Sequence, residues 1–173
     1  MKWLIASDIH GSIKHCERLA TRIVFENPDR ILLLGDILKG FYFGDEPERV
    51  AALLNTFSDK ILCVKGNCDY QEDIKLLDFP VSNYEIIHFG DKVAYAHHGH
   101  MYFDFTKLKK TPDIILSGHT HKPENIVEFG QILLNPGSVS MPRGGSRHGY
   151  MTFEDNTFYF KDLDGEVYDK FCL

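Results

Sequence analysis

The chain has 173 residues, of which 43% are hydrophobic and 25% are charged, and its formal net charge is −6. This length suits one domain with a substantial core, so we expect residues 1–173 to form a single domain. The ordinary composition excludes a disordered, collagen-like or coiled-coil chain, and the acidic balance argues against long nucleic acid or a membrane surface as a partner.

The first half of the chain alternates between predicted strands and helices. Apolar runs predict buried strands over residues 2–7, 30–36 and 60–67, and helical spacing of apolar residues predicts helices over 10–27, 47–57 and 70–79. Pro28 and Pro80 end the first and the third of these helices. A β-α-β-α-β-α order predicts a parallel sheet with right-handed crossovers.

The second half is richer in strands and has short turns. We expect hairpins over residues 84–98, 125–136 and 149–169, a short helix over 104–111, and a strand over 113–118. Together the two halves predict an α/β fold in which two mixed sheets stack with helices outside. The loop over residues 40–48 is aromatic and acidic, which favours a lid or a subunit contact. Its cluster Phe41, Tyr42 and Phe43 is either core or a subunit contact, and we favour the contact.

Two features bear on the cell compartment. The N-terminal apolar run is interrupted by charge at Asp8, so it is too short for a signal peptide or a membrane span. The four cysteines form no C-x-x-C pair, which argues against a disulfide framework and against a structural zinc knuckle. We therefore expect a cytoplasmic protein.

Residues of metal-binding types follow the predicted strands. In open α/β sheets, sites form at the carboxyl ends of strands, so we expect these side chains to share one crevice. They are Asp8, His10, Asp36, Asn67, His98, His119 and His121. Seven oxygen and nitrogen donors exceed what one ion uses, and they suit two adjacent ions that share a carboxylate.

The donor types indicate the ions and their use. Imidazole with carboxylate favours Mn, Fe, Zn, Ni or Co over Ca or Mg. Two such ions, about 3.5–4 Å apart, are the usual arrangement for hydrolysis of phosphate esters, because they bind phosphoryl oxygens and lower the pKa of a water between them. His119 and His121 would then each serve a different ion.

Simpler interpretations exist for several of these residues. Asp8 and Asp36 could be helix caps, although their repetition behind strands makes capping alone an incomplete explanation. Cys68 could be a small buried hydrophobe, but its position between Asn67 and Asp69 favours a place in the site. We expect His15 and His88 to be structural and His148, beside Gly149, to be a turn residue. Arg143 and Arg147 belong either to a solvated loop or to a phosphate clamp.

The motifs "DIHG", "GD", "GNCD", "HGH" and "GHTH" occur in the order and spacing of the calcineurin-like metallophosphoesterases. With "NPGSVSMPRGG", the chain resembles the small bacterial and archaeal phosphodiesterases of that family over nearly its whole length. The resemblance implies a four-layer α/β/β/α sandwich. It implies that Asp8, His10, Asp36 and His121 hold a first metal ion, and that Asp36, Asn67, His98 and His119 hold a second. Asp69 would orient a neighbouring residue.

One position departs from many members of the family. Cys68 stands where they have a histidine that assists the leaving group, and a free thiol is a poorer acid near neutral pH. Either the substrate has a good leaving group, or another residue assists. His100 is the first alternative and His97 the second.

The resemblance and the residues together predict a metal-dependent phosphodiesterase. A hydroxide bridging two divalent ions, with manganese first among the candidates, would attack a small phosphodiester in line. The metals, Asn67 and a histidine would hold the developing charge. The resemblance also implies a homo-oligomer, a dimer or higher. The alternatives are a phosphomonoesterase of the same family and a non-catalytic scaffold with the same fold. A scaffold would be expected to lose ligands, and all seven are present here.

Overall fold

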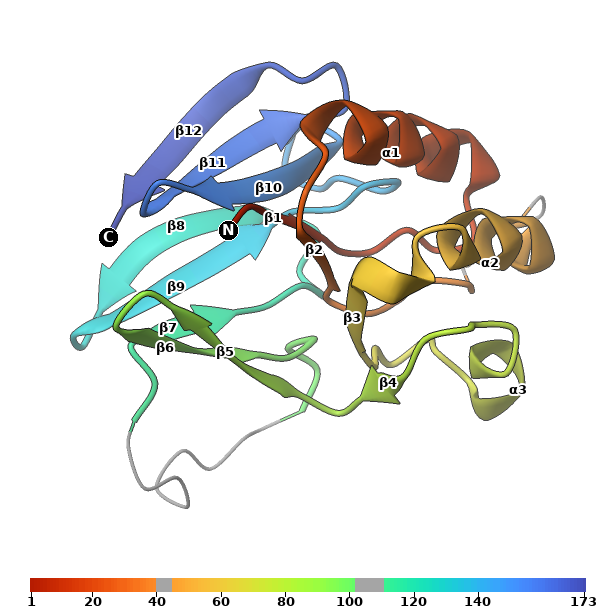
Figure 1. The fold of residues 1–173 in the computed structure, drawn as a ribbon, viewed down its shortest axis with the longest axis horizontal. Helices are drawn as coiled ribbons and strands as arrows, with labels where there is room; N and C mark the ends of the chain where they lie inside the picture. The colour runs from red at the N-terminus through yellow and green to blue at the C-terminus, as the bar shows by residue number, and fades with distance from the viewer. Residues whose placement is uncertain (40–44, 102–110) are drawn as a thin grey trace.

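Two mixed β-sheets stack to form the protein, as Figure 1 shows for this computed structural model, which describes residues 1–39, 45–101 and 111–173. The seven-stranded sheet has the order β12-β11-β10-β1-β2-β3-β4, and the five-stranded sheet has the order β5-β6-β7-β9-β8. The stacked α/β sandwich that the sequence predicts is confirmed.

The first half of the chain builds the parallel part of the larger sheet. Its strands are β1 (Trp3–Ala6), β2 (Arg30–Leu33), β3 (Ile61–Val64) and β4 (Val81–Ser82). Between them lie α1 (Ile13–Glu26), α2 (Pro47–Asn55), a 3-10 turn (Ser58–Lys60) and the short α3 (Gln71–Ile74). Asn27 caps α1 in the left-handed conformation directly before Pro28, so the helix ends where the sequence predicts.

The second half supplies the hairpins. β10 (Gly149–Glu154), β11 (Thr157–Asp162) and β12 (Val167–Cys172) extend the larger sheet in antiparallel fashion from β1. The smaller sheet contains β5 (Glu85–Phe89), β6 (Lys92–Ala96), β7 (Ile114–Leu116), β8 (Pro123–Glu128) and β9 (Gln131–Pro136). The predicted hairpins are confirmed. The aromatic cluster at 41–43, and all but the last residue of the helix predicted over 104–111, lie outside the described residues.

Two apolar cores flank the larger sheet, because alternate residues of a strand face opposite sides. Leu4 of β1 packs toward α1 and α2, where it joins Leu19 and Leu54. The next residue, Ile5, faces the smaller sheet and joins Phe89 and other residues of β5 to β9. The strands are thereby held from both sides, and their carboxyl ends are fixed in space. None of the helices in these three described ranges has the length and hydropathy needed to cross a membrane.

Hydrogen bonds and ion pairs of Glu26 connect the end of α1 to the larger sheet. Glu26 accepts hydrogen bonds from Tyr150 at 3.0 Å and Lys161 at 2.8 Å, and it pairs with Lys2 at 2.7 Å. Its side chain is 6% exposed. Burial opposes ionisation, but the contacts with Lys161 and Lys2 outweigh it and hold the pKa of Glu26 below its usual range.

We predict that Glu26→Gln lowers the free energy of unfolding by about 3 kcal/mol, because Lys161 is then left nearly buried without its carboxylate. Glu154→Gln is the matched control. Glu154 is more exposed and lies 3.5 Å from Lys2, so its loss should change stability by less than about 1 kcal/mol. Denaturant unfolding measures both. Since the folded pKa of Glu26 is depressed, its contribution should fade as the pH falls through that pKa. Equal losses in the two variants would contradict the role of Glu26.

Candidate metal centre

The predicted ligands follow the carboxyl ends of strands from both sheets. Asp8 and His10 follow β1, Asp36 follows β2, and Asn67 follows β3 in the larger sheet. In the smaller sheet, His98 follows β6, and His119 and His121 follow β7. The structure brings all seven together at one edge of the sandwich. Asn67 and His119 are exposed, whereas the other five are buried.

Five of the seven residues have a left-handed backbone. Their φ angles are 58° for Asp8, 50° for His10, 54° for Asp36, 67° for His119 and 61° for His121. Such a conformation costs roughly 1–3 kcal/mol for a residue other than glycine, and it persists only where surrounding contacts enforce it. Concentrated strain of this kind is typical of a functional site.

Two glycines permit the close approach of the loops. A Cβ atom at Gly66 would collide with the side chain of Asp36, and one at Gly118 would collide with the hydroxyl of Ser7. Both glycines therefore stand where only a hydrogen atom fits between two loops of the centre.

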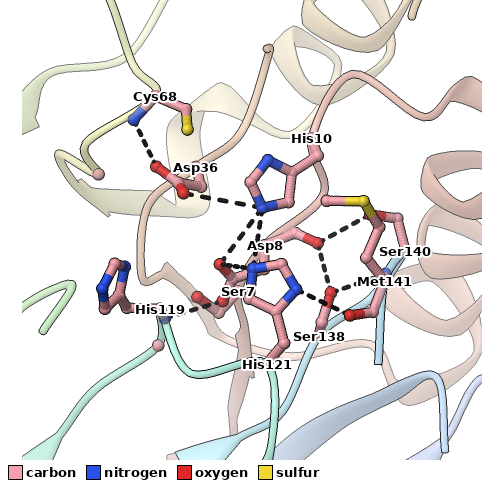
Figure 2. A network of polar contacts seen from close by, with 12 residues as sticks. Ser7, Asp8, His10, Asp36, Cys68, His119, His121, Ser138, Ser140 and Met141 are labelled. Carbon is pink, nitrogen blue, oxygen red and sulfur yellow. Dashed lines mark hydrogen bonds and ion pairs between the residues drawn. The ribbon is translucent and has the colours of Figure 1, made fainter. Parts of the chain in front are cut away.

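Asp8, His10 and His121 form the first cluster, whose ligand atoms all lie within 4.8 Å of one another. The Nδ1 atom of His10 faces the carbonyl oxygen of Lys39 at 3.0 Å, and that of His121 faces the carbonyl of Met141 at 2.7 Å. A carbonyl can only accept, so both Nδ1 atoms carry the proton. The two Nε2 atoms then meet as lone pairs at 3.1 Å, as Figure 2 shows. A cation or an added proton must lie between them.

Asp36, His98 and His119 form the second cluster, within the same 4.8 Å limit. His98 donates from Nδ1 to the carbonyl of Leu34 at 2.6 Å. Its Nε2 lone pair therefore faces Asp36 Oδ2 at 3.3 Å and Asn67 Oδ1 at 3.2 Å, and both of these are acceptors. Asp36 Oδ2 also lies 3.7 Å from His10 Nε2, so its carboxylate stands between the two clusters.

The charges of the buried carboxylates and imidazoles also favour the binding of a cation. Burial opposes the ionisation of Asp8, but contacts with His10 and His121 outweigh it and lower the pKa of this carboxyl. Burial likewise opposes the charging of His10 and His98, yet Asp8 and Asp36 raise the pKa of these imidazoles. Asp8 Oδ1 is buried and accepts no hydrogen bond from the described residues when the nearby Nε2 atom of His121, at 3.1 Å, carries a lone pair. The residues present therefore fit divalent metal ions, which replace such protons at carboxylate and imidazole ligands.

Asp69 organises the backbone beside the second cluster. Its carboxylate accepts hydrogen bonds from the backbone N–H groups of Gly66, Asp36 and Ile37, each at 2.8 Å. Cys68 donates its backbone N–H to Asp36 Oδ1 at 2.8 Å, and its sulfur lies in ligand range of His10 and Asp36. Burial, followed by the charge of Asp36, raises the pKa of the Cys68 thiol to about 12. These surroundings favour the protonated thiol, which does not suit a nucleophile or a strong proton donor.

The two histidines considered for the leaving group differ in position. The ring centre of His100 lies 5.3 Å from that of His98 and 6.3 Å from that of His119, so His100 borders the second cluster. Burial, His98 and His119 lower its pKa. His97 instead packs near Tyr95, with ring centres 5.3 Å apart, and its pKa is lowered to about 4 by burial and by the neighbouring histidines.

The two arginines of the glycine-rich loop also differ. Arg147 pairs with Asp162 at 2.8 Å and Glu166 at 2.7 Å, which does not support a phosphate clamp. Arg143 donates its backbone N–H to the carbonyl of His121 at 3.0 Å, and its side chain is exposed beside the first cluster.

Sequence reasoning missed the residues that support Asp8. The hydroxyls of Ser138 and Ser140 both donate to the carbonyl oxygen of Asp8, at 2.9 and 3.0 Å. The backbone N–H of Met141 donates to Ser138 Oγ at 2.8 Å (Figure 2). The spacing of these serines after the "NPG" turn was the available signal, but a serine pair in a loop has many uses.

Comparison with known proteins agrees with this geometry. The profile of the calcineurin-like phosphoesterase superfamily domain matches residues 1–157. Phosphodiesterase YfcE from Escherichia coli (strain K12) is 34% identical over 159 residues, which cover 87% of this chain and 85% of that protein. Probable metallophosphoesterase YsnB from Bacillus subtilis (strain 168) is 28% identical, covering 95% and 93%.

Solved structures show the same likeness. The structure of YfcE, a phosphoesterase from E. coli, matches with a TM-score of 0.90 at 30% identity and covers 99% of both chains. Vps29 from Entamoeba histolytica, complexed with zinc, matches with a TM-score of 0.68 at 22% identity, covering 99% of this chain and 98% of that one, which shows the fold alone. The resemblance drawn from the motifs is confirmed: the chain belongs to the calcineurin-like phosphoesterase superfamily.

Proposed function

We propose that this protein is a metal-dependent phosphodiesterase that hydrolyses small phosphodiesters. The observation that carries the proposal is the pair of clusters with the Asp36 carboxylate between them, in which imidazole lone pairs and carboxylates face one another. The relative YfcE, named a phosphodiesterase, supports the choice of diesters. The acidic net charge of −6 supports a small substrate over long nucleic acid.

The two clusters suggest how the ligands divide between two ions. Asp8, His10, Asp36 and His121 would hold the first, and Asp36, Asn67, His98 and His119 the second. Imidazole and carboxylate donors favour a transition metal; manganese is the first candidate, with nickel, iron, zinc and cobalt as the others. When bound, two such ions supply Lewis-acid activation of the phosphoryl group and of water.

The residues of the chain then have separate tasks. Asn67 and His100 stand at the exposed side of the centre, where they would contact phosphoryl oxygens and hold developing charge. His98 is fixed by the Leu34 carbonyl, and Asp69 fixes the backbone of Asp36. The Cys68 thiol lies beside His10 and Asp36, and its raised pKa favours the neutral form.

The leaving group receives little help from an acid in this arrangement. The pKa of the Cys68 thiol is raised and that of His100 is lowered, and both shifts make these side chains weak proton donors to a leaving group near neutral pH. Such a site suits a substrate whose alcohol departs readily. The relative YfcE, named a phosphodiesterase, favours the diesterase over the phosphomonoesterase alternative.

The scaffold alternative conflicts with the strain at the centre. A non-catalytic protein gains nothing from five left-handed residues of other types than glycine, which together oppose folding by several times about 1–3 kcal/mol. All seven ligand positions are also retained. The homo-oligomeric state and the cytoplasmic location stay predictions.

Hydrolysis of bis-p-nitrophenyl phosphate, compared with p-nitrophenyl phosphate, tests the proposed activity. The protein is stripped with a chelator, and Mn, Ni, Co, Zn and Mg are returned one at a time. We expect turnover of the diester only with added transition metal, with Mn the most effective, and little turnover of the monoester. Preference for the monoester would overturn the substrate class, and inactivity of protein that binds two ions would favour the scaffold.

A second prediction concerns the leaving group. Across a series of aryl methyl phosphate diesters, kcat/KM should fall steeply as the pKa of the leaving phenol rises, because neither Cys68 nor His100 is a strong proton donor. Cys68→Ser should keep the same slope and retain activity within about threefold, since the neutral thiol takes no part in proton transfer. A shallow slope in the wild-type protein that steepens in Cys68→Ser would show that Cys68 is the acid after all.

A further inference from the structure

Two histidines that the proposed function does not use stack against each other between α1 and the loop that leads into β10. His15 of α1 and His148, just before β10, have ring centres 4.5 Å apart and planes inclined by 13°. Both are half-buried. The Nδ1 atom of His15 lies 2.8 Å from the hydroxyl of Ser12, the residue that precedes α1. The stack therefore joins the start of α1 to the loop that leads into β10.

His148 also holds the segment of residues 138–141. Its Nδ1 atom faces the carbonyl oxygen of Val139 at 2.9 Å, so that nitrogen carries the proton and donates it. Val139 is fully buried, and its own N–H donates to the carbonyl of Ser7 at 3.0 Å. His148 therefore holds residues 138–141 through its hydrogen bond to the Val139 carbonyl.

The other side of the same segment contacts two predicted ligands of the first ion. The hydroxyls of Ser138 and Ser140 donate to the carbonyl oxygen of Asp8, and the Met141 carbonyl accepts the Nδ1 proton of His121 at 2.7 Å. The last contact decides which nitrogen of His121 keeps a lone pair. A shift of the segment would move the Asp8 backbone and the His121 ring together.

We propose that His148, supported by its stack on His15, is a positioning residue for the first metal ion and acts through residues 138–141. The inference rests on the proposed function, since it assumes that Asp8 and His121 bind that ion. The second cluster is positioned by different groups, namely the Leu34 carbonyl on His98 and Asp69 on the Asp36 backbone. His148 therefore affects one ion much more than the other.

Calorimetric titration of chelator-stripped protein with Mn²⁺ tests the inference in three variants. His148→Phe keeps a ring for the stack but loses the donor to Val139, and it should weaken one of the two binding steps about tenfold and the other by less than about threefold. His148→Asn keeps an N–H donor near the position of Nδ1 and should restore most of the loss. His15→Ala should give a smaller loss in the same step. His88→Phe is the control, because His88 is exposed on β5, and it should change neither step.

The outcomes distinguish a failure of the proposed function from a failure of the inference about His148. Failure of the wild-type protein to bind two ions would overturn the proposed function and this inference with it. If the wild-type protein binds two ions, unchanged steps in a folded His148→Phe protein would overturn the inference alone. Equal weakening of both steps with a lower unfolding midpoint would also overturn it, because that result describes a general loss of stability. Lack of recovery in His148→Asn, together with unchanged steps in His15→Ala, would overturn the inference, because neither the hydrogen bond to Val139 nor the stack on His15 would then affect the first ion.

Discussion

The fixed tautomers of three histidines determine the character of the whole centre. His10, His98 and His121 each direct Nδ1 at a backbone carbonyl oxygen, which leaves Nε2 as a lone pair aimed at buried carboxylates. Lone pairs and carboxylates repel one another in a poorly hydrated site unless a cation lies among them. Backbone carbonyls rotate only with the chain, so this preference is built into the fold and does not depend on flexible side chains.

The rest of the structure stabilises this arrangement, although the strained backbone of the ligand residues opposes folding. Five residues have a left-handed backbone, and each such conformation costs roughly 1–3 kcal/mol. Contacts with the surrounding loops hold the residues in these conformations. Asp69 binds three backbone N–H groups around Asp36, and Ser138 and Ser140 bind the Asp8 carbonyl from the opposite side. Strand ends buried between two cores provide the rigid base that these loops require.

The sequence predicts the parallel sheet of the first half, the hairpins and the seven ligand types, because these depend on local periodicity and on residue chemistry. It does not predict the tautomers, the left-handed backbone or the support from Ser138, since these arise between distant segments: Ser138 lies 130 residues from Asp8 in the chain. The contacts of His148 are the clearest example of a feature that the sequence alone does not predict. As an isolated histidine before a strand it suggests a structural residue, and only its contacts with His15 and Val139 connect it to the metal centre.

We propose that Asp36 lies between two metal ions held by the first and second clusters. Anomalous X-ray scattering at the manganese edge, from crystals of protein loaded with Mn²⁺, tests this most directly. We expect two peaks, one beside Asp8, His10 and His121 and one beside His98 and His119, with Asp36 in contact with both. A single peak, or two peaks of which Asp36 contacts only one, would contradict it.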